Sequence, residues 1–159
     1  MTWFELRRED LSFLGRAPWS VRCDGEVEAP RAAVFAALAD PGTWSAWFPG
    51  VRRAWYPSPA PYGVGTIREA EVGGTRWVEE LIAWEADHRW AYTVTRASVP
   101  IARAQVESFE LETRGPATRV TWTLACEPRL LMRLGSPAAP RVIRRVFARA
   151  LENLGRYLS

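Results

Sequence analysis

Apolar and polar residues alternate one by one along residues 19–29. Val21 and Cys23 fall on one parity, whereas Asp24 and Glu26 fall on the other. A period of two is typical of a strand with one buried and one exposed face. This segment is therefore predicted to be a half-buried strand with an acidic outer face.

Two short helices are predicted directly after this strand. Pro30 suits the first turn of a helix, the apolar positions in 33–38 recur at helical spacing, and the run 40–42 (Asp-Pro-Gly) ends the segment. A second helical turn covers residues 44–48. Turn-forming residues then separate six further predicted strands, at 51–56, 64–72, 76–84, 89–97, 103–113 and 118–126.

A long helix is predicted at the C-terminal end. Phe147, Leu151 and Leu154 belong to one apolar stripe at helical spacing. The opposite face, typical of a solvated surface, carries Arg141, Arg144, Arg145, Arg149, Glu152 and Arg156. This order of elements predicts an α+β fold in a single domain of residues 19–159. Residues 1–18 mix apolar and charged side chains and are predicted to form a strap over that domain.

The pairing of the central strands depends on the turn at Gly73-Gly74. A three-residue turn sets Arg68 opposite Glu80, whereas a two-residue turn sets Arg68 opposite Glu79 and mixes polar with apolar residues on both faces. We expect the three-residue turn, with Trp77 on the outer face. The other turns place Trp84 with Trp90, and Phe109 and Leu111 opposite Val120 and Trp122. The polar residues expected on the inner face are Arg68, Glu80, Tyr92 and Arg96.

The chain contains nine Trp in 159 residues. A curved sheet covered by one helix cannot easily pack so many indoles, so some are expected to line a cavity or else to lie at an interface. The expected ligand contacts are Trp47, Trp84, Trp90, Arg96, Phe109 and Trp122. Two alternatives stay open, because these aromatic residues could simply be core and Arg68–Glu80 could be a structural ion pair.

Composition excludes several kinds of chemistry. The chain has no Lys, which rules out Schiff-base catalysis. A single His (His88) and two distant Cys (Cys23 and Cys126) do not supply the usual zinc ligands, and no cofactor is expected. A net charge of +3 with scattered Arg argues against nucleic-acid binding. Short apolar runs predict no membrane span, so a cytoplasmic protein, monomer or homodimer, is expected.

Several motifs together resemble those of a known superfamily. They are the run 27–40, Trp44-x-x-Trp47-x-Pro49-Gly50-Val51, Gly63-Val-Gly65-Thr-x-Arg68 and Ala117-Thr-Arg-Val-Thr-Trp122. Over residues 19–158 the chain resembles the SRPBCC (START-like) superfamily, and within it the polyketide cyclase/dehydrase branch. The resemblance implies a helix-grip fold, in which a seven-stranded antiparallel sheet wraps around the long C-terminal helix and encloses a deep apolar cavity. Its members include aromatase/cyclases as well as lipid and hormone carriers.

Three functions are compatible with these patterns. A cyclase or dehydratase acting on a polyketide-like substrate would use Arg68 or Arg96 to stabilise an enolate, Tyr92 to donate a hydrogen bond and Glu80 to exchange protons. A non-catalytic carrier of a hydrophobic molecule needs only the cavity and a gate. The gate would consist of Leu130, Leu131, Met132 and Leu134, which fit an ordinary packed turn equally well. A module that binds a protein partner is the third hypothesis.

Overall fold

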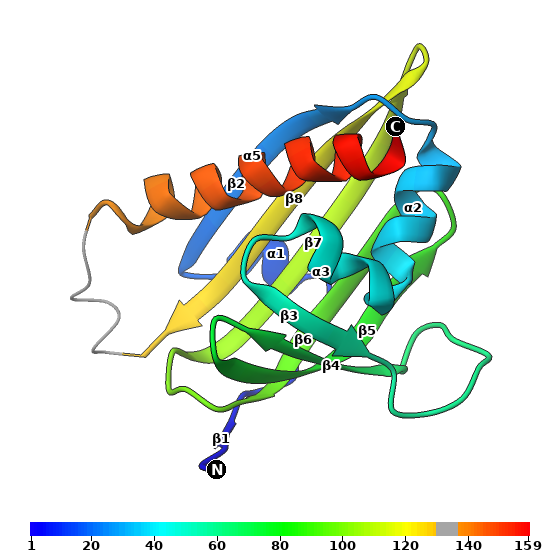
Figure 1. The fold of residues 1–159 in the computed structure, drawn as a ribbon. Helices are drawn as coiled ribbons and strands as arrows, with labels where there is room; N and C mark the ends of the chain where they lie inside the picture. The colour runs from blue at the N-terminus through cyan, green and yellow to red at the C-terminus, as the bar shows by residue number, and fades with distance from the viewer. Residues whose placement is uncertain (130–136) are drawn as a thin grey trace.

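Seven antiparallel strands form one curved sheet in the computed structural model, which describes residues 1–129 and 137–159 (Figure 1). In spatial order the strands run β2-β8-β7-β6-β5-β4-β3, and the short β1 pairs with β6 off this path. Their bounds are β1 Phe4–Glu5, β2 Trp19–Val27, β3 Val51–Trp55, β4 Ile67–Val72, β5 Thr75–Glu85, β6 Arg89–Ala97, β7 Ala102–Arg114 and β8 Ala117–Pro128. Each of the seven strands expected from the sequence is present.

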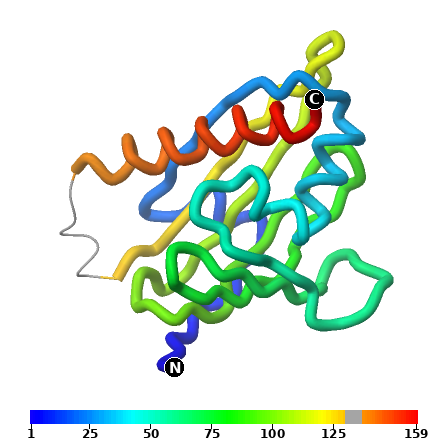
Figure 2. The backbone as a smooth tube through the Cα atoms, in the orientation of Figure 1, coloured from blue at the N-terminus to red at the C-terminus, as the bar shows by residue number. Residues whose placement is uncertain are grey.

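The helix α5 (Ala139–Leu158) lies across the concave face of this sheet (Figures 1 and 2). It buries Phe147, Leu151 and Leu154 among the core residues. The remaining helical elements are α1 Phe13–Arg16, α2 Arg31–Ala39, the 3-10 turn η1 Pro41–Thr43 and α3 Trp44–Trp47. A sheet that grips one long helix, with α2 and α3 after its first long strand, confirms the predicted helix-grip fold.

Close contact between α5 and β2 depends on a glycine. A Cβ atom added to Gly25 would lie 2.6 Å from Cδ1 of Leu151, which is far inside van der Waals contact. The side chain of Leu151 is itself buried. Gly25 therefore lets the helix approach the sheet at this point.

The N-terminal segment crosses the outer face of the sheet. Residues 4–7 lie between the separated ends of β6 and β7, because the Leu6 N–H donates to Thr95 O at 2.9 Å and the Arg7 N–H donates to Arg103 O at 2.7 Å. Phe13 of α1 is buried in a small second core with Ala104, Val106 and Ala125. The segment thus completes the sheet where two strands diverge and covers part of its convex side.

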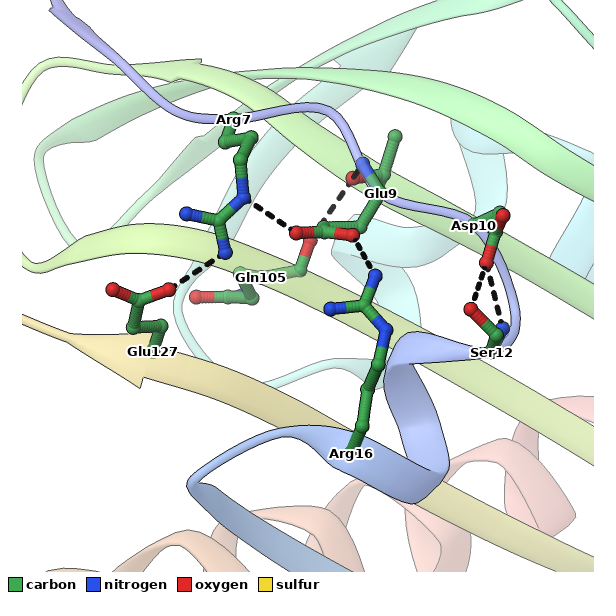
Figure 3. A network of polar contacts seen from close by, with 8 residues as sticks. Arg7, Glu9, Asp10, Ser12, Arg16, Gln105 and Glu127 are labelled. Atoms are coloured by element: carbon green, nitrogen blue, oxygen red, sulfur yellow. Dashed lines mark hydrogen bonds and ion pairs between the residues drawn. The ribbon is translucent and has the colours of Figure 1, made fainter.

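An ion-pair network holds this segment in place (Figure 3). Arg7 contacts both Glu9 and Glu127, at 2.6 Å each, and Arg16 approaches the same Glu9 from α1. Burial by itself raises the pKa of Glu9, but the hydrogen bonds and charges of Arg7 and Arg16 outweigh it and lower that pKa. The Glu9 carboxylate is therefore stabilised in its charged form.

The predicted register of β4 and β5 is wrong by one residue. Val72 pairs with Thr75, so that Gly73 and Gly74 alone form the turn, with φ of 54° and 80°. Two successive positive φ angles are typical of the tight hairpin turns that match strand twist, and glycine adopts them without strain. As a result Arg68 lies opposite Glu79 rather than Glu80.

This register reverses the predicted faces of β5 from Trp77 to Leu81, where a second irregularity restores the predicted faces for Trp84. Trp77 and Glu79 line the interior, whereas Glu80 pairs with Arg8 of the N-terminal segment. The expectation that Glu80 faces inward and Trp77 outward was wrong, because a one-residue slip moves every side chain to the other face.

A bulge explains the misplacement of Arg96. Val78 pairs with Arg96 but Glu79 pairs with Val94, so Thr95 is an extra residue in β6. Such a bulge interrupts the strict alternation of faces. Val94 and Ala97 are buried in the core, whereas Arg96 is exposed and lies 5.2 Å from the Trp3 ring. Arg96 therefore does not face the interior as predicted.

The remaining predicted pairings are confirmed. Trp84 pairs with Trp90 across β5 and β6, and Phe109 pairs with Trp122 across β7 and β8. Leu111 lies opposite Val120, as expected from the turn at residues 114–117.

Candidate functional site

A cavity of about 750 Å³ lies between the concave face of the sheet and the first half of α5. Its size falls within the range of small-molecule sites. The walls are mainly apolar and include six aromatic side chains, Trp19, Trp44, Phe48, Trp77, Tyr92 and Phe147. Polar groups reach the cavity from the central strands, namely Arg68, Thr75, Glu79, Gln105 and Glu107.

Arg68 and Glu79 form a buried ion pair in the cavity wall. Nη1 of Arg68 lies 2.5 Å from Oε2 of Glu79, and the two side chains are 2% and 6% exposed. The guanidinium also lies 4.0 Å from the centre of the Trp44 ring, a cation–π contact. Nε of Arg68 is buried without a hydrogen-bond partner among the described residues. One N–H donor of this cation is therefore unsatisfied in the structure.

Glu107 is a second buried carboxylate, held by neutral hydrogen-bond donors. The indole Nε1 of Trp122 donates to Oε2 at 2.9 Å, and the amide Nε2 of Gln105 donates to Oε1 at 3.2 Å. Among the described residues no ion pair is formed by this carboxylate. It differs in this respect from Glu79, whose charge is compensated by Arg68.

The environment of Glu107 raises its pKa from 4.5 to about 7. Burial is the main cause, and the hydrogen bond from Trp122 opposes it, while the nearby charge of Glu79 raises the pKa further. Tyr92, directly across β6 and β7 from Glu107, has a pKa well above 10 because it is buried beside these carboxylates. A carboxyl group with this pKa can both accept and donate a proton near neutral pH.

The structure places the predicted site residues in three groups. Arg68 and Tyr92 line the cavity. Glu80 and Arg96 lie outside it, for the reasons of register given above. The predicted aromatic contacts do not line it and pack elsewhere, namely Trp47, Trp84, Trp90, Phe109 and Trp122.

These aromatic residues support the cavity from behind. Trp122 stacks on Phe147 with ring centres 3.8 Å apart and donates its hydrogen bond to Glu107. Trp90 and Phe109 pack together against Trp44, which lines the cavity. Trp90, Phe109 and Trp122 thus fix the positions of lining groups without lining the cavity themselves.

Glu79 and Glu107 were not among the site residues predicted from the sequence. A two-residue turn at Gly73-Gly74 would have placed Glu79 beside Arg68. Glu107 has the parity of Phe109, which was assigned to the inner face, so simple alternation along β7 could have identified it. The proposed gate of Leu130, Leu131, Met132 and Leu134 lies outside the described residues.

The described part of the chain contains neither a metal-binding cluster nor a membrane-spanning helix. Across residues 1–129 and 137–159, no group of three His, Cys, Asp or Glu side chains is arranged to hold a metal ion. In the same ranges, no helix combines the length and the apolar character needed to cross a bilayer.

A curved antiparallel sheet that encloses an apolar cavity against a C-terminal helix defines the START-like, helix-grip class of proteins. Residues 18–159 match the family described as polyketide cyclase/dehydrase and lipid transport, and the chain belongs to this family. Uncharacterised proteins of Mycobacterium bovis and Mycobacterium tuberculosis are 30% identical to it over 161 residues, which cover 97% of this chain and 93% of theirs.

Solved structures share the fold. A START superfamily protein from Mycobacterium smegmatis superposes with a TM-score of 0.72 at 14% identity, covering 87% of this chain and 96% of that one. The Zhui aromatase/cyclase from a Streptomyces species gives a TM-score of 0.70 at 18% identity, covering 88% of this chain and 93% of that one. Identities this low show a common fold and leave the reaction to be argued from the site.

Proposed function

We propose that the protein binds an apolar, carbonyl-bearing small molecule, polyketide- or lipid-like, and catalyses its cyclisation and dehydration. One observation carries the proposal: Glu107, a buried carboxyl group with a pKa of about 7 and no ion-pair partner among the described residues, lines a mainly apolar cavity. Strongly shifted carboxyl groups in cavities are common among general acids and bases.

The polar groups of the cavity match the steps of an intramolecular aldol reaction. The Glu107 carboxylate removes a proton from the carbon next to a carbonyl group, and the resulting enolate oxygen is stabilised by the guanidinium of Arg68. The enolate carbon forms a bond to a second carbonyl carbon of the same chain. Protonated Glu107 returns its proton to the new alkoxide, and loss of the hydroxyl group with a neighbouring hydrogen releases water.

The shape of the cavity supports cyclisation rather than an intermolecular reaction. Its aromatic walls restrict a flexible chain to folded conformers, and such confinement lowers the entropic part of a barrier. The family description names both polyketide cyclases and lipid transport, and the Zhui protein is an aromatase/cyclase. A carrier that binds without turnover is the second candidate, since the apolar lining alone is sufficient for binding.

Incubation with a tetra-β-keto thioester of N-acetylcysteamine separates the two functions. We expect cyclised, dehydrated product to form faster than in buffer, detected by mass spectrometry. Glu107→Gln should lower the rate about 100-fold while leaving the dissociation constant within about threefold, because general acid–base catalysis typically contributes ~10²–10⁴-fold. The matched control Glu80→Gln, on the outer face, should behave like the wild type.

Saturable binding with no rate above buffer would support the carrier instead. Equal losses of rate in Glu107→Gln and Glu80→Gln would contradict the assignment of Glu107. Thermal unfolding of each variant, measured under the assay conditions, ensures that the comparison is made between folded proteins.

A further inference from the structure

A second hollow, here called the α3–α5 groove, lies on the surface beside the cavity. Its volume is about 640 Å³. One side is formed by residues 45–51, which belong to α3, the connection to β3 and the first residue of β3, and the other side is formed by α5. The α5 residues that line it are Val142, Arg145, Val146, Arg149 and Asn153.

The groove and the cavity are direct neighbours. Phe48, Val51 and Val146 border both spaces, so these apolar side chains form part of the wall between them. The Asn153 amide donates a hydrogen bond to Trp47 O at 3.1 Å and thereby ties α5 to α3 at one end of the groove. A molecule bound across both the groove and the cavity would therefore pass between α3 and α5, whose relative position this hydrogen bond helps to fix.

The lining of the groove contains two unpaired cations. Arg145 and Arg149 lie one helical turn apart on α5, and both are exposed. Neither side chain forms a hydrogen bond or an ion pair with any other described residue. Asp and Glu are absent from the residues that line the groove. Most other Arg side chains of the described part contact a carboxylate, as Arg7, Arg53 and Arg76 do.

We propose that the α3–α5 groove binds the anionic headgroup, a carboxylate or phosphate, of an amphiphile whose apolar chain extends into the cavity. This inference rests on the proposed function, because it requires the cavity to accept an apolar chain. The charges fix the orientation of the ligand. Arg145 and Arg149 attract an anion at the groove, whereas Arg68, the one cation among the described residues that line the cavity, is already paired with Glu79.

Calorimetric titration with four dodecyl compounds tests the proposal, the three ionic compounds below their critical micelle concentrations and the alcohol below its solubility limit. They are dodecanoate, dodecyl phosphate, dodecanol and dodecyltrimethylammonium. We expect both anions to bind the wild type about tenfold more tightly than dodecanol, since charge-assisted hydrogen bonds at exposed sites are worth roughly 1 kcal/mol or somewhat more. The cation should bind most weakly. Comparison of the two anions distinguishes a carboxylate from a phosphate headgroup.

Three variants locate the effect. Arg145→Gln/Arg149→Gln should remove the preference for the anions and leave dodecanol binding unchanged. Val142→Glu, at a side chain that is 54% exposed, should weaken anion binding by placing a carboxylate in the groove. The control Arg103→Gln/Arg114→Gln removes the same charge from residues that line neither space and should have little effect.

The outcomes separate this inference from the proposed function. If dodecanol binds but the anions bind no better, or if the control variant weakens anion binding as much as Arg145→Gln/Arg149→Gln, the headgroup site is wrong while the apolar cavity stands. If no dodecyl compound binds to the wild type, both proposals are wrong.

Discussion

Replacing Glu107 by Gln should remove a defined part of the pH dependence of stability. The carboxyl group has a pKa of about 7 in the folded protein against 4.5 for an unperturbed Glu. Between these values the folded state binds more protons than the unfolded state, so the free energy of unfolding falls as the pH rises. At about 1.4 kcal/mol per pH unit, the raised pKa contributes about 3 kcal/mol to the free energy of unfolding at low pH. This contribution is lost as the pH rises through 7.

Urea denaturation of both proteins between about pH 5 and pH 8 measures this effect. The stability of the wild type relative to Glu107→Gln should fall by about 2.5 kcal/mol across that range, because the wild type alone must ionise the buried group. Taking the difference cancels groups common to both proteins, such as Glu9, whose pKa is lowered. A difference that is constant with pH, or that grows in favour of the wild type, would refute the assignment of a raised pKa to Glu107.

Two further substitutions probe the packing of the site. Arg68→Met should destabilise the fold by about 3–5 kcal/mol, because Glu79 is left buried without its partner, and adding Glu79→Leu should restore most of this loss in urea denaturation. If the double variant is no more stable than Arg68→Met, the unpaired charge is not the cause. Gly25→Ala should cost about 1–3 kcal/mol because its Cβ would meet Leu151, and a cycle with Leu151→Ala should show a much smaller cost in that background. Additive effects would argue against the contact.

The fold could be predicted from the sequence because its signals are local and repeated. The alternation of apolar and polar residues predicts β2, the prolines and the helical spacing predict α2, and the apolar stripe predicts α5. The predicted and observed boundaries of these elements agree within a few residues. The pairings of Trp84 with Trp90 and of Phe109 with Trp122 also followed, because the turns beside them leave little freedom of register.

The site was harder to predict because it depends on single-residue changes in register. The tight turn at Gly73-Gly74 exchanges Glu80 for Glu79, and one extra residue at Thr95 turns Arg96 outward. The hydrophobic pattern does not reveal a bulge, because the strand with the extra residue and the strand without it place a similar number of apolar residues inside. The three-residue turn was expected because it keeps polar and apolar residues on separate faces of the sheet. That expectation was wrong because the interior accommodates polar residues as well, in the form of the paired Arg68 and Glu79.

The burial of Glu107 also bears on the choice between catalysis and transport. Lipid or polyketide carriage requires an apolar lining, which Trp19, Trp77 and Phe147 provide. Glu107 adds nothing to such a lining, and keeping it buried lowers stability above pH 7 by about 3 kcal/mol, a large part of the ~5–15 kcal/mol that stabilises a typical domain. Residues that reduce stability without improving packing are concentrated at sites of chemistry. A glutamine or leucine at position 107 would serve a carrier better, so the glutamate favours proton transfer.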